Sequence, residues 1–86
     1  MPKFYIHFRN RDRYTHQDLL AKDDEGQDFP GLDEAKEAAL VSAREILADN
    51  IKGDAKNPLQ AVIISNGSGQ DLMTILTRDI LPEPLK

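Results

Sequence analysis

The sequence predicts a small α+β domain, an antiparallel sheet of three or four strands with one long helix packed on one face. Two patterns predict it. Residues 32–51 repeat apolar side chains at helical spacing, and three other segments alternate or cluster them as strands do, namely residues 3–9, 59–65 and 72–77. A chain of 86 residues suffices for one domain with a thin core. We therefore interpret residues 1–86 as a single domain with an irregular tail at 80–86.

The first strand is predicted over residues 3–9. Phe4, Ile6 and Phe8 alternate there with other residues, and this period of two places all three on one face, which we expect to point to the core. Residues 10–18 are polar and have no periodicity, so they are predicted to form a loop.

A small hairpin is predicted between this loop and the helix. Residues 19–22 and 27–29 are its two arms, and residues 23–26 (DDEG) have turn chemistry, with Gly26 able to adopt a positive φ. The acidic run does not match a calcium loop, because with Gly26 in sixth place the first and twelfth ligand positions would be apolar residues. We expect an ordinary acidic turn.

The helix is predicted from Leu32 to Ile51. Gly31 is an acceptable N-cap, acidic residues occupy the first turn near the positive end of the helix dipole, and Asn57-Pro58 prevents continuation. Its small residues should let it lie close to the sheet. The residues on the predicted buried face are Leu32, Ala35, Ala39, Ala43, Ile46, Leu47 and Ile51.

A second hairpin is predicted near the end of the chain. Residues 59–65 have a continuous apolar centre, residues 65–69 (SNGSG) form the turn, and residues 70–78 return as its partner strand. Because this glycine-rich turn leads into a strand and not into a helix, it does not predict a phosphate site. Ile80 and Leu81 are expected to dock on the core.

The strand pattern also predicts an interface. One helix can cover one face of the sheet, yet the final hairpin is apolar on both faces, and exposed apolar faces mark interaction sites. We expect a homodimer that buries the second face or pairs two sheet edges. The alternative is that the first loop and the tail cover this face. The residues assigned to the dimer face are Ala61, Ile63, Met73 and Ile75.

No set of residues predicts catalysis, a metal or a cofactor. His7 and His16 without any Cys are a poor zinc set, and Asp18, Asp23 or Asp24 could complete one only by folding back. The spacing of a nucleophilic triad is absent. We assign no catalytic, metal-binding or cofactor-binding residues, expect no enzyme activity, and interpret His7 as a solvated strand residue.

The charge is uneven along the chain, which suggests a charged partner. Residues 1–16 carry +3 and the remainder carries −7. Arginines near aromatic residues suit phosphate contacts and base stacking. The candidate nucleic-acid contacts are Lys3, Arg9, Arg11, Arg13 and Tyr14. The alternative is a solvated loop whose arginines pair with Asp23, Asp24 or Asp28.

Composition guides the expected location. The chain has no Cys, it has no apolar run near the ~18 residues that span a bilayer, and its first residues lack the apolar core of a signal peptide. We expect a cytoplasmic protein without a membrane partner.

Three segments carry a resemblance to a known family. They are the opening Met-Pro-Lys-Phe-Tyr-Ile-His, the acidic turn at 23–30 with the alanine-rich helix after it, and a final hairpin with Gly69 followed by Leu72. Together they resemble a small uncharacterised domain family found mainly in rhizobial and related alphaproteobacteria. The resemblance implies the fold and a bacterial source, and no activity. The long, basic segment 10–18 departs from the family pattern.

A second resemblance concerns residues 26–30 and the helix that follows. They are similar to the corresponding part of small antitoxins that pair with RNA-targeting toxins, although the usual Gly-Asp-Thr helix entry is missing. The sequence thus predicts a non-catalytic protein-interaction domain that forms a homodimer. The alternative is a nucleic-acid-binding or antitoxin-like module that uses the basic N-terminal strand and loop.

Overall fold

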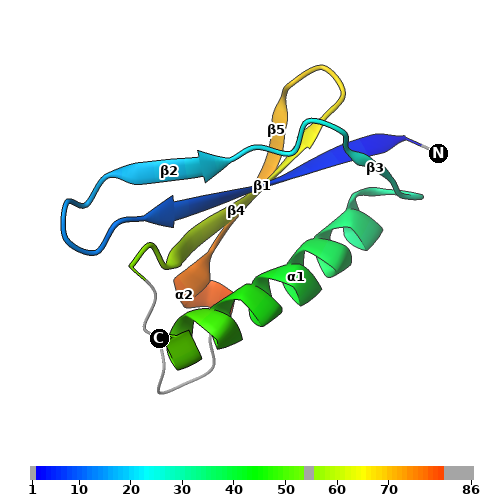
Figure 1. Cartoon of the computed structure of the whole chain (residues 1–86). Coiled ribbons are helices and arrows are strands. Elements are labelled where there is room, and N and C mark those ends of the chain that lie inside the picture. The colour runs from blue at the N-terminus through cyan, green and yellow to red at the C-terminus, as the bar shows by residue number, and fades with distance from the viewer. Residues whose placement is uncertain (1, 54–55, 81–86) are drawn as a thin grey trace.

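The computed structural model describes residues 2–53 and 56–80, and one long helix packs in it against a five-stranded antiparallel sheet (Figure 1). The predicted α+β class is therefore confirmed, with five strands in place of three or four. The elements in chain order are β1 (Lys3–Arg11), β2 (Asp18–Ala21), β3 (Gln27–Asp28), α1 (Leu32–Gly53), β4 (Leu59–Asn66), β5 (Asp71–Leu76) and α2 (Thr77–Ile80).

The strand order is β2-β1-β4-β5, and β3 also pairs with β1. One edge of β1 pairs with β4 along its length. The other edge pairs with β2 between Phe8 and Arg11 and with β3 at Lys3 and Phe4. β2 and β3 therefore lie end to end along one edge of β1, separated by the turn that joins them.

This arrangement corrects two predictions about residues 10–29. The segments predicted as two arms of one hairpin do not pair with each other, since each pairs with β1. The predicted loop 10–18 is shorter, because β1 continues to Arg11 and β2 begins at Asp18. Both short strands gain more by extending the ladder of a long central strand than by forming an isolated hairpin, which is marginally stable in water.

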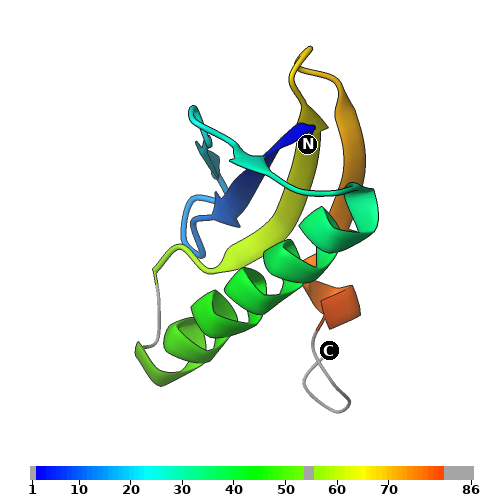
Figure 2. The same cartoon turned by 90° about the vertical axis from the view of Figure 1, so that its right-hand side faces the viewer.

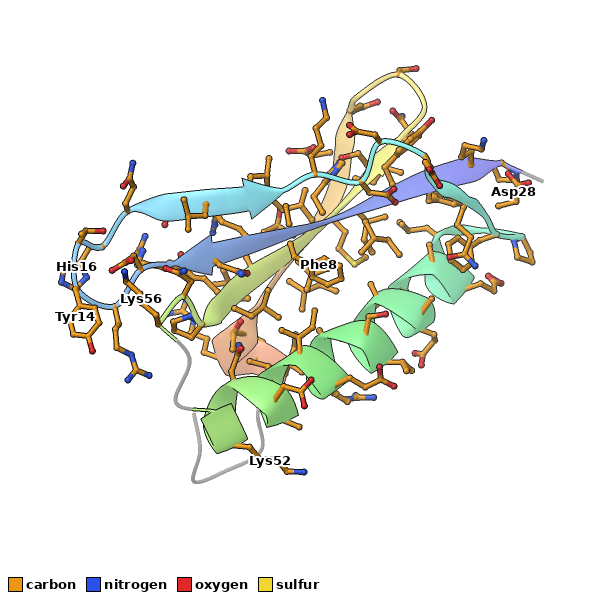
Figure 3. All side chains as sticks on the ribbon, viewed as in Figure 1. Phe8, Tyr14, His16, Asp28, Lys52 and Lys56 are labelled. Atoms are coloured by element: carbon orange, nitrogen blue, oxygen red, sulfur yellow. The ribbon has the colours of Figure 1, made fainter. Side chains whose placement is uncertain are left out.

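The core lies between α1 and the sheet. Phe4, Ile6 and Phe8 of β1 point toward α1, as predicted, and Figure 3 places Phe8 between the two layers. The helix presents alanines that are completely buried, so its backbone lies close to the sheet. The buried cluster comprises Phe4, Phe29, Ala35, Ala39, Ala43, Leu47, Leu59, Val62 and Ile64. Within the described ranges, no helix is long and apolar enough to cross a membrane.

The predicted second hairpin is confirmed at its turn. The Asn66 Oδ1 atom accepts hydrogen bonds from the backbone N–H groups of Ser68 and Gln70, both at 3.0 Å. Gly69 adopts a φ of 83°, a left-handed conformation that favours glycine.

The end of the predicted partner strand is different. β5 stops at Leu76, and residues 77–80 turn into the short helix α2. The Thr77 hydroxyl donates to the carbonyl of Leu59 at 2.9 Å and ties this helix to the start of β4. Ile80 packs against the core as predicted, whereas Leu81 lies outside the described residues.

Candidate binding face of the sheet

One face of the sheet is not covered by α1, which lies on a single side of it (Figure 2). Side chains alternate between faces along a strand, so Tyr5, His7 and Arg9 point away from the helix-facing residues of β1. The register places Ala61 opposite Arg9 and Ile63 opposite His7. We call this surface the open face. Within the part of the chain that the structure describes, neither α1 nor α2 covers the open face (Figures 1 and 2).

The sequence assigned four residues to a dimer face, namely Ala61, Ile63, Met73 and Ile75. The structure divides them between the two faces. Ala61 and Ile63 belong to the open face, but Met73 and Ile75 pair with Ile64 and Val62 and so share the helix side. On β5, Thr74 and Leu76 pair with Ile63 and Ala61 and so belong to the open face. The prediction from sequence was wrong about the register of β5 by one residue, and a shift of one residue moves every side chain of a strand to the other face.

The open face is hollowed. A cavity of about 400 Å³ opens on it. Its lining residues are Tyr5, His7, Leu20, Lys22, Asp23, Asp24, Ile63, Ser65, Asn66, Gly67, Gly69 and Asp71. His7 and Ser65 are 8% and 3% exposed, because the β2–β3 connection and the β4–β5 turn border the hollow on two sides.

His7 is part of the fold and is not the solvated residue that the sequence suggested. Its Nδ1 atom accepts a hydrogen bond of 3.0 Å from the backbone N–H of Asp23. A neutral imidazole that accepts at Nδ1 carries its proton on Nε2. The ring therefore holds the β2–β3 connection against β1 and keeps an Nε2–H donor.

Asp23 fastens the same connection from its carboxylate. Oδ2 accepts the N–H of Ile6 at 3.2 Å, and Oδ1 accepts the N–H groups of Glu25 at 3.2 Å and Gly26 at 3.0 Å. Burial raises the pKa of the Asp23 carboxyl, but the hydrogen bonds from the backbone N–H groups of Gly26, Ile6 and Glu25 outweigh burial and lower it. β2 and β3 leave a gap along this edge of β1, and within the gap the Asp23 carboxylate accepts the Ile6 N–H in place of a strand partner.

Gly26 closes the acidic turn in the way the sequence predicted. Its φ is 73°, and a Cβ atom built there would lie 2.8 Å from Lys3 Cγ and 2.9 Å from Tyr5 Cε1. Both the backbone conformation and the space require glycine. The acidic turn predicted at residues 23–26 is confirmed. The hydrogen bond from the Ile6 N–H to the Asp23 carboxylate was not predictable from the sequence.

The hollow is acidic on balance. Three aspartates and one lysine, Lys22, line it. Asp71 accepts a hydrogen bond of 2.8 Å from the Ser65 hydroxyl. Asp24 is exposed, and its carboxylate makes no hydrogen bond within the described residues. The hollow thus offers carboxylate oxygens above an apolar floor at Ile63.

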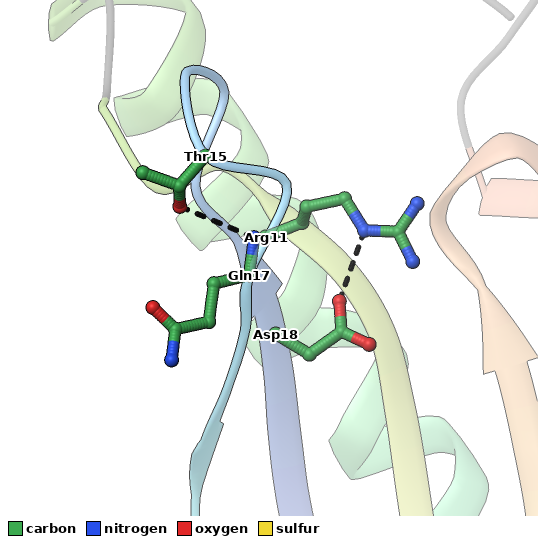
Figure 4. Close-up of polar contacts among 4 residues, drawn as sticks. All are labelled: Arg11, Thr15, Gln17 and Asp18. Carbon is green, nitrogen blue, oxygen red and sulfur yellow. Dashed lines mark hydrogen bonds and ion pairs between the residues drawn. The ribbon is translucent and has the colours of Figure 1, made fainter.

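The opposite end of the open face is basic. Arg11 Nε lies 2.9 Å from Asp18 Oδ1 in an exposed ion pair across the β1–β2 hairpin (Figure 4). That guanidinium bond lowers the pKa of Asp18 despite the opposing effect of desolvation. The sequence named Asp23, Asp24 or Asp28 as the intramolecular partners, so Asp18 corrects the partner of Arg11. In the same turn the Thr15 hydroxyl accepts the N–H of Gln17 at 3.2 Å (Figure 4).

The structure brings part of the predicted basic set together. The backbone N–H of Arg13 donates to the carbonyl of Lys56 at 3.0 Å, so Lys56 joins the hairpin end beside Arg11. Tyr14 is 73% exposed there, and Figure 3 shows Tyr14, His16 and Lys56 at the same end. Lys56 was not predictable from sequence as part of this end, because nothing local in the sequence relates it to the hairpin.

Two residues of that set lie elsewhere. Lys3 is eight residues from Arg11 along β1, about 26 Å at strand spacing, and it pairs with Asp28 at the far end. Arg9 lies on the open face between the two ends, and its Nε atom is buried without a hydrogen-bond partner within the described residues. Among residues 2–53 and 56–80, no three His, Cys, Asp or Glu residues come together in a way that could hold a metal.

The comparisons with known proteins give one match. A family described as a domain of unknown function (DUF6894) matches residues 3–77. This match confirms the resemblance to an uncharacterised domain family that the opening strand, the acidic turn and the final hairpin predicted. Neither the comparison with curated proteins nor that with solved structures found a match.

Proposed function

The chain belongs to this family of domains of unknown function, DUF6894, and we propose that it is a non-catalytic protein-interaction domain that forms a homodimer through the open face of its sheet. The observation that carries the proposal is that α1 covers one face and leaves the other uncovered. A two-layer domain that leaves one sheet face to solvent keeps part of its apolar surface available to a partner.

The centre of that face supports the proposal further. Leu20 is 56% exposed and lies opposite Arg9 in the strand register. Ile63 and Leu76 are half-buried on the same face. Protein interfaces typically combine an apolar centre with a polar rim, and here charged residues border the apolar centre at both ends.

Light scattering over a concentration series tests the proposal. We expect the mass of a dimer at tens of micromolar and a shift toward the monomer for Leu20→Glu. Val41→Glu is the matched control, because Val41 is an apolar residue of similar exposure, 52% against 56%, on the outer side of α1. A monomer at every concentration would refute the homodimer, and equal effects of the two substitutions would refute its placement on the open face.

A second candidate function is nucleic-acid binding by the hairpin end. Arg11, Arg13 and Lys56 gather there beside the exposed ring of Tyr14, and cations with an accessible aromatic residue suit a single-stranded backbone and its bases. The hypothesis of an antitoxin-like module is part of this second candidate function. A cytoplasmic location is part of our proposal under either function.

Binding of labelled single-stranded RNA and duplex DNA at ~50 and ~200 mM salt separates the two candidates, since phosphate contacts make affinity strongly salt-dependent. The informative variant is Arg11→Glu, Arg13→Glu, Lys56→Glu. A variant with Lys36, Arg44 and Lys52 of α1 reversed to Glu has the same net charge and serves as control. Salt-sensitive binding lost in the first variant alone would favour nucleic acid, and no binding would leave the interaction domain.

A further inference from the structure

The open face carries opposite charge at its two ends. Arg11 points from it at the β1–β2 hairpin, and Arg9 points from it two residues further along β1, toward the centre of the face, by strand alternation. The hollow near the other end is lined by three carboxylates and one ammonium group. The apolar residues Leu20 and Leu76 lie in the same row across the sheet as Arg9, and Leu20 and Ile63 also line the hollow.

This inference rests on the proposed function. We infer that two copies pack their open faces together in antiparallel orientation, with Arg9 and Arg11 of each copy over the acidic hollow of the other. A two-fold axis that lies in the interface and crosses β1 at a right angle reverses the strand direction in the second copy. The arginine end of each copy then meets the carboxylate end of its partner, and both contacts form at once.

The groups that would meet are incompletely satisfied within one copy. The Arg9 Nε atom is buried and lacks a partner within the described residues, and the Asp24 carboxylate makes no hydrogen bond there. Arg11 pairs with Asp18 while both side chains are nearly half exposed, 45% and 46%. Exposed pairs of this kind contribute little, so Arg11 can turn to a better-desolvated carboxylate at small cost.

The dimensions fit such a dimer. Arg11 lies six residues from Tyr5, which borders the hollow, and six residues of strand span about 20 Å. The molecule measures 38 × 26 × 17 Å, so a broad face can supply the ~800 Å² that each partner buries in an interface of standard size. The other face-to-face arrangement, with the two-fold axis along β1, places arginine on arginine and carboxylate on carboxylate, and like-charge repulsion disfavours it.

Charge exchange between copies tests the arrangement. Arg11→Glu alone places two carboxylate ends together, and Asp24→Lys alone places two cationic ends together, so each variant should raise the Kd of the dimer about tenfold or more. An equal mixture of the two variants should restore a dimer, because Glu at position 11 of one copy then meets Lys at position 24 of the other, while the second contact keeps its native pair. Sedimentation velocity on each variant and on the mixture, with circular dichroism to verify folding, measures this.

The controls are Arg44→Glu and Glu45→Lys, which reverse exposed charges on α1, and we expect them to dimerise like the wild type. If Leu20→Glu disrupts the dimer but the exchanged charges do not, the open face is the interface and the antiparallel arrangement is refuted. A mixture no more dimeric than its components also refutes it. A wild-type chain that stays monomeric refutes the homodimer itself, so the two failures can be told apart.

Discussion

Asp23 is the residue on which the open face depends most directly. Its carboxylate accepts three backbone N–H groups, and its own N–H is held by His7. Asp23→Asn keeps one acceptor oxygen and turns the other into a donor, so it should lower the free energy of unfolding by about 1–3 kcal/mol. Urea denaturation of the variant and of Asp24→Asn, both too dilute to associate, measures the difference. Equal stability of the two would contradict the assigned role.

The same carboxyl predicts a pH dependence. Its pKa is lowered from 3.8 in the folded chain, so its stabilising contribution is complete above the unfolded value and is lost as the pH falls through the folded value. Below pH 3.8 the wild type should lose stability more steeply than Asp23→Asn, which has no proton to take up at this position. Parallel acid titrations of unfolding for the two proteins would show it, and identical slopes would rule it out.

Three glycines form a graded series at the residue scale. Gly26 combines a φ of 73° with close neighbours, Gly69 has a φ of 83° in open space, and Gly67 has neither constraint. Substitution by Ala should lower the free energy of unfolding most at Gly26. The loss should be about 1–2 kcal/mol at Gly69, and the change at Gly67 should stay within ~0.5 kcal/mol. Thermal unfolding of the three variants gives the order, and a Gly26→Ala protein as stable as Gly67→Ala would contradict the crowding.

At the scale of elements, the contact between α1 and the sheet depends on small side chains. Ala39 is completely buried against the sheet, so Ala39→Leu has no room and should destabilise by about 1–3 kcal/mol through overpacking. Ala48→Leu makes the same change on an exposed position of the helix and should stay within ~0.5 kcal/mol. Chemical denaturation compares the free energies of unfolding of the two variants. An Ala39→Leu variant as stable as the wild type would mean that the helix and the sheet can move apart freely.

Elements with a strong period were predictable from sequence. The alternation of Phe4, Ile6 and Phe8 identified β1 and its core face, and the alanine spacing identified α1. Partners and register were not predictable, because they depend on contacts far apart in the chain. A shift of one residue reassigned Met73 and Ile75 to the helix side. The candidate site was predicted least well, since the hollow depends on the strand order and on the bonds of Asp23.

The whole molecule should be unevenly stable across its sheet. β4 is flanked by β1 and β5 and holds five buried residues, whereas all four residues of β2 are exposed and this strand pairs along one edge. Opening free energies follow such burial, from near zero at exposed edges up to the global value in central strands. Amide hydrogen exchange of the dilute chain should therefore be slowest in β4 and much faster in β2.

The concentration dependence of the same exchange links stability to assembly. In the antiparallel dimer the open-face side of β2 lies near the partner through Leu20, while the outward surface of α1 remains in solvent. Raising the concentration should slow the amides around Leu20, because strand separation must then also open the interface, and should leave those around Val41 unchanged. Equal slowing at both places would indicate a global gain in stability, and no slowing at Leu20 would place the dimer contact away from the open face.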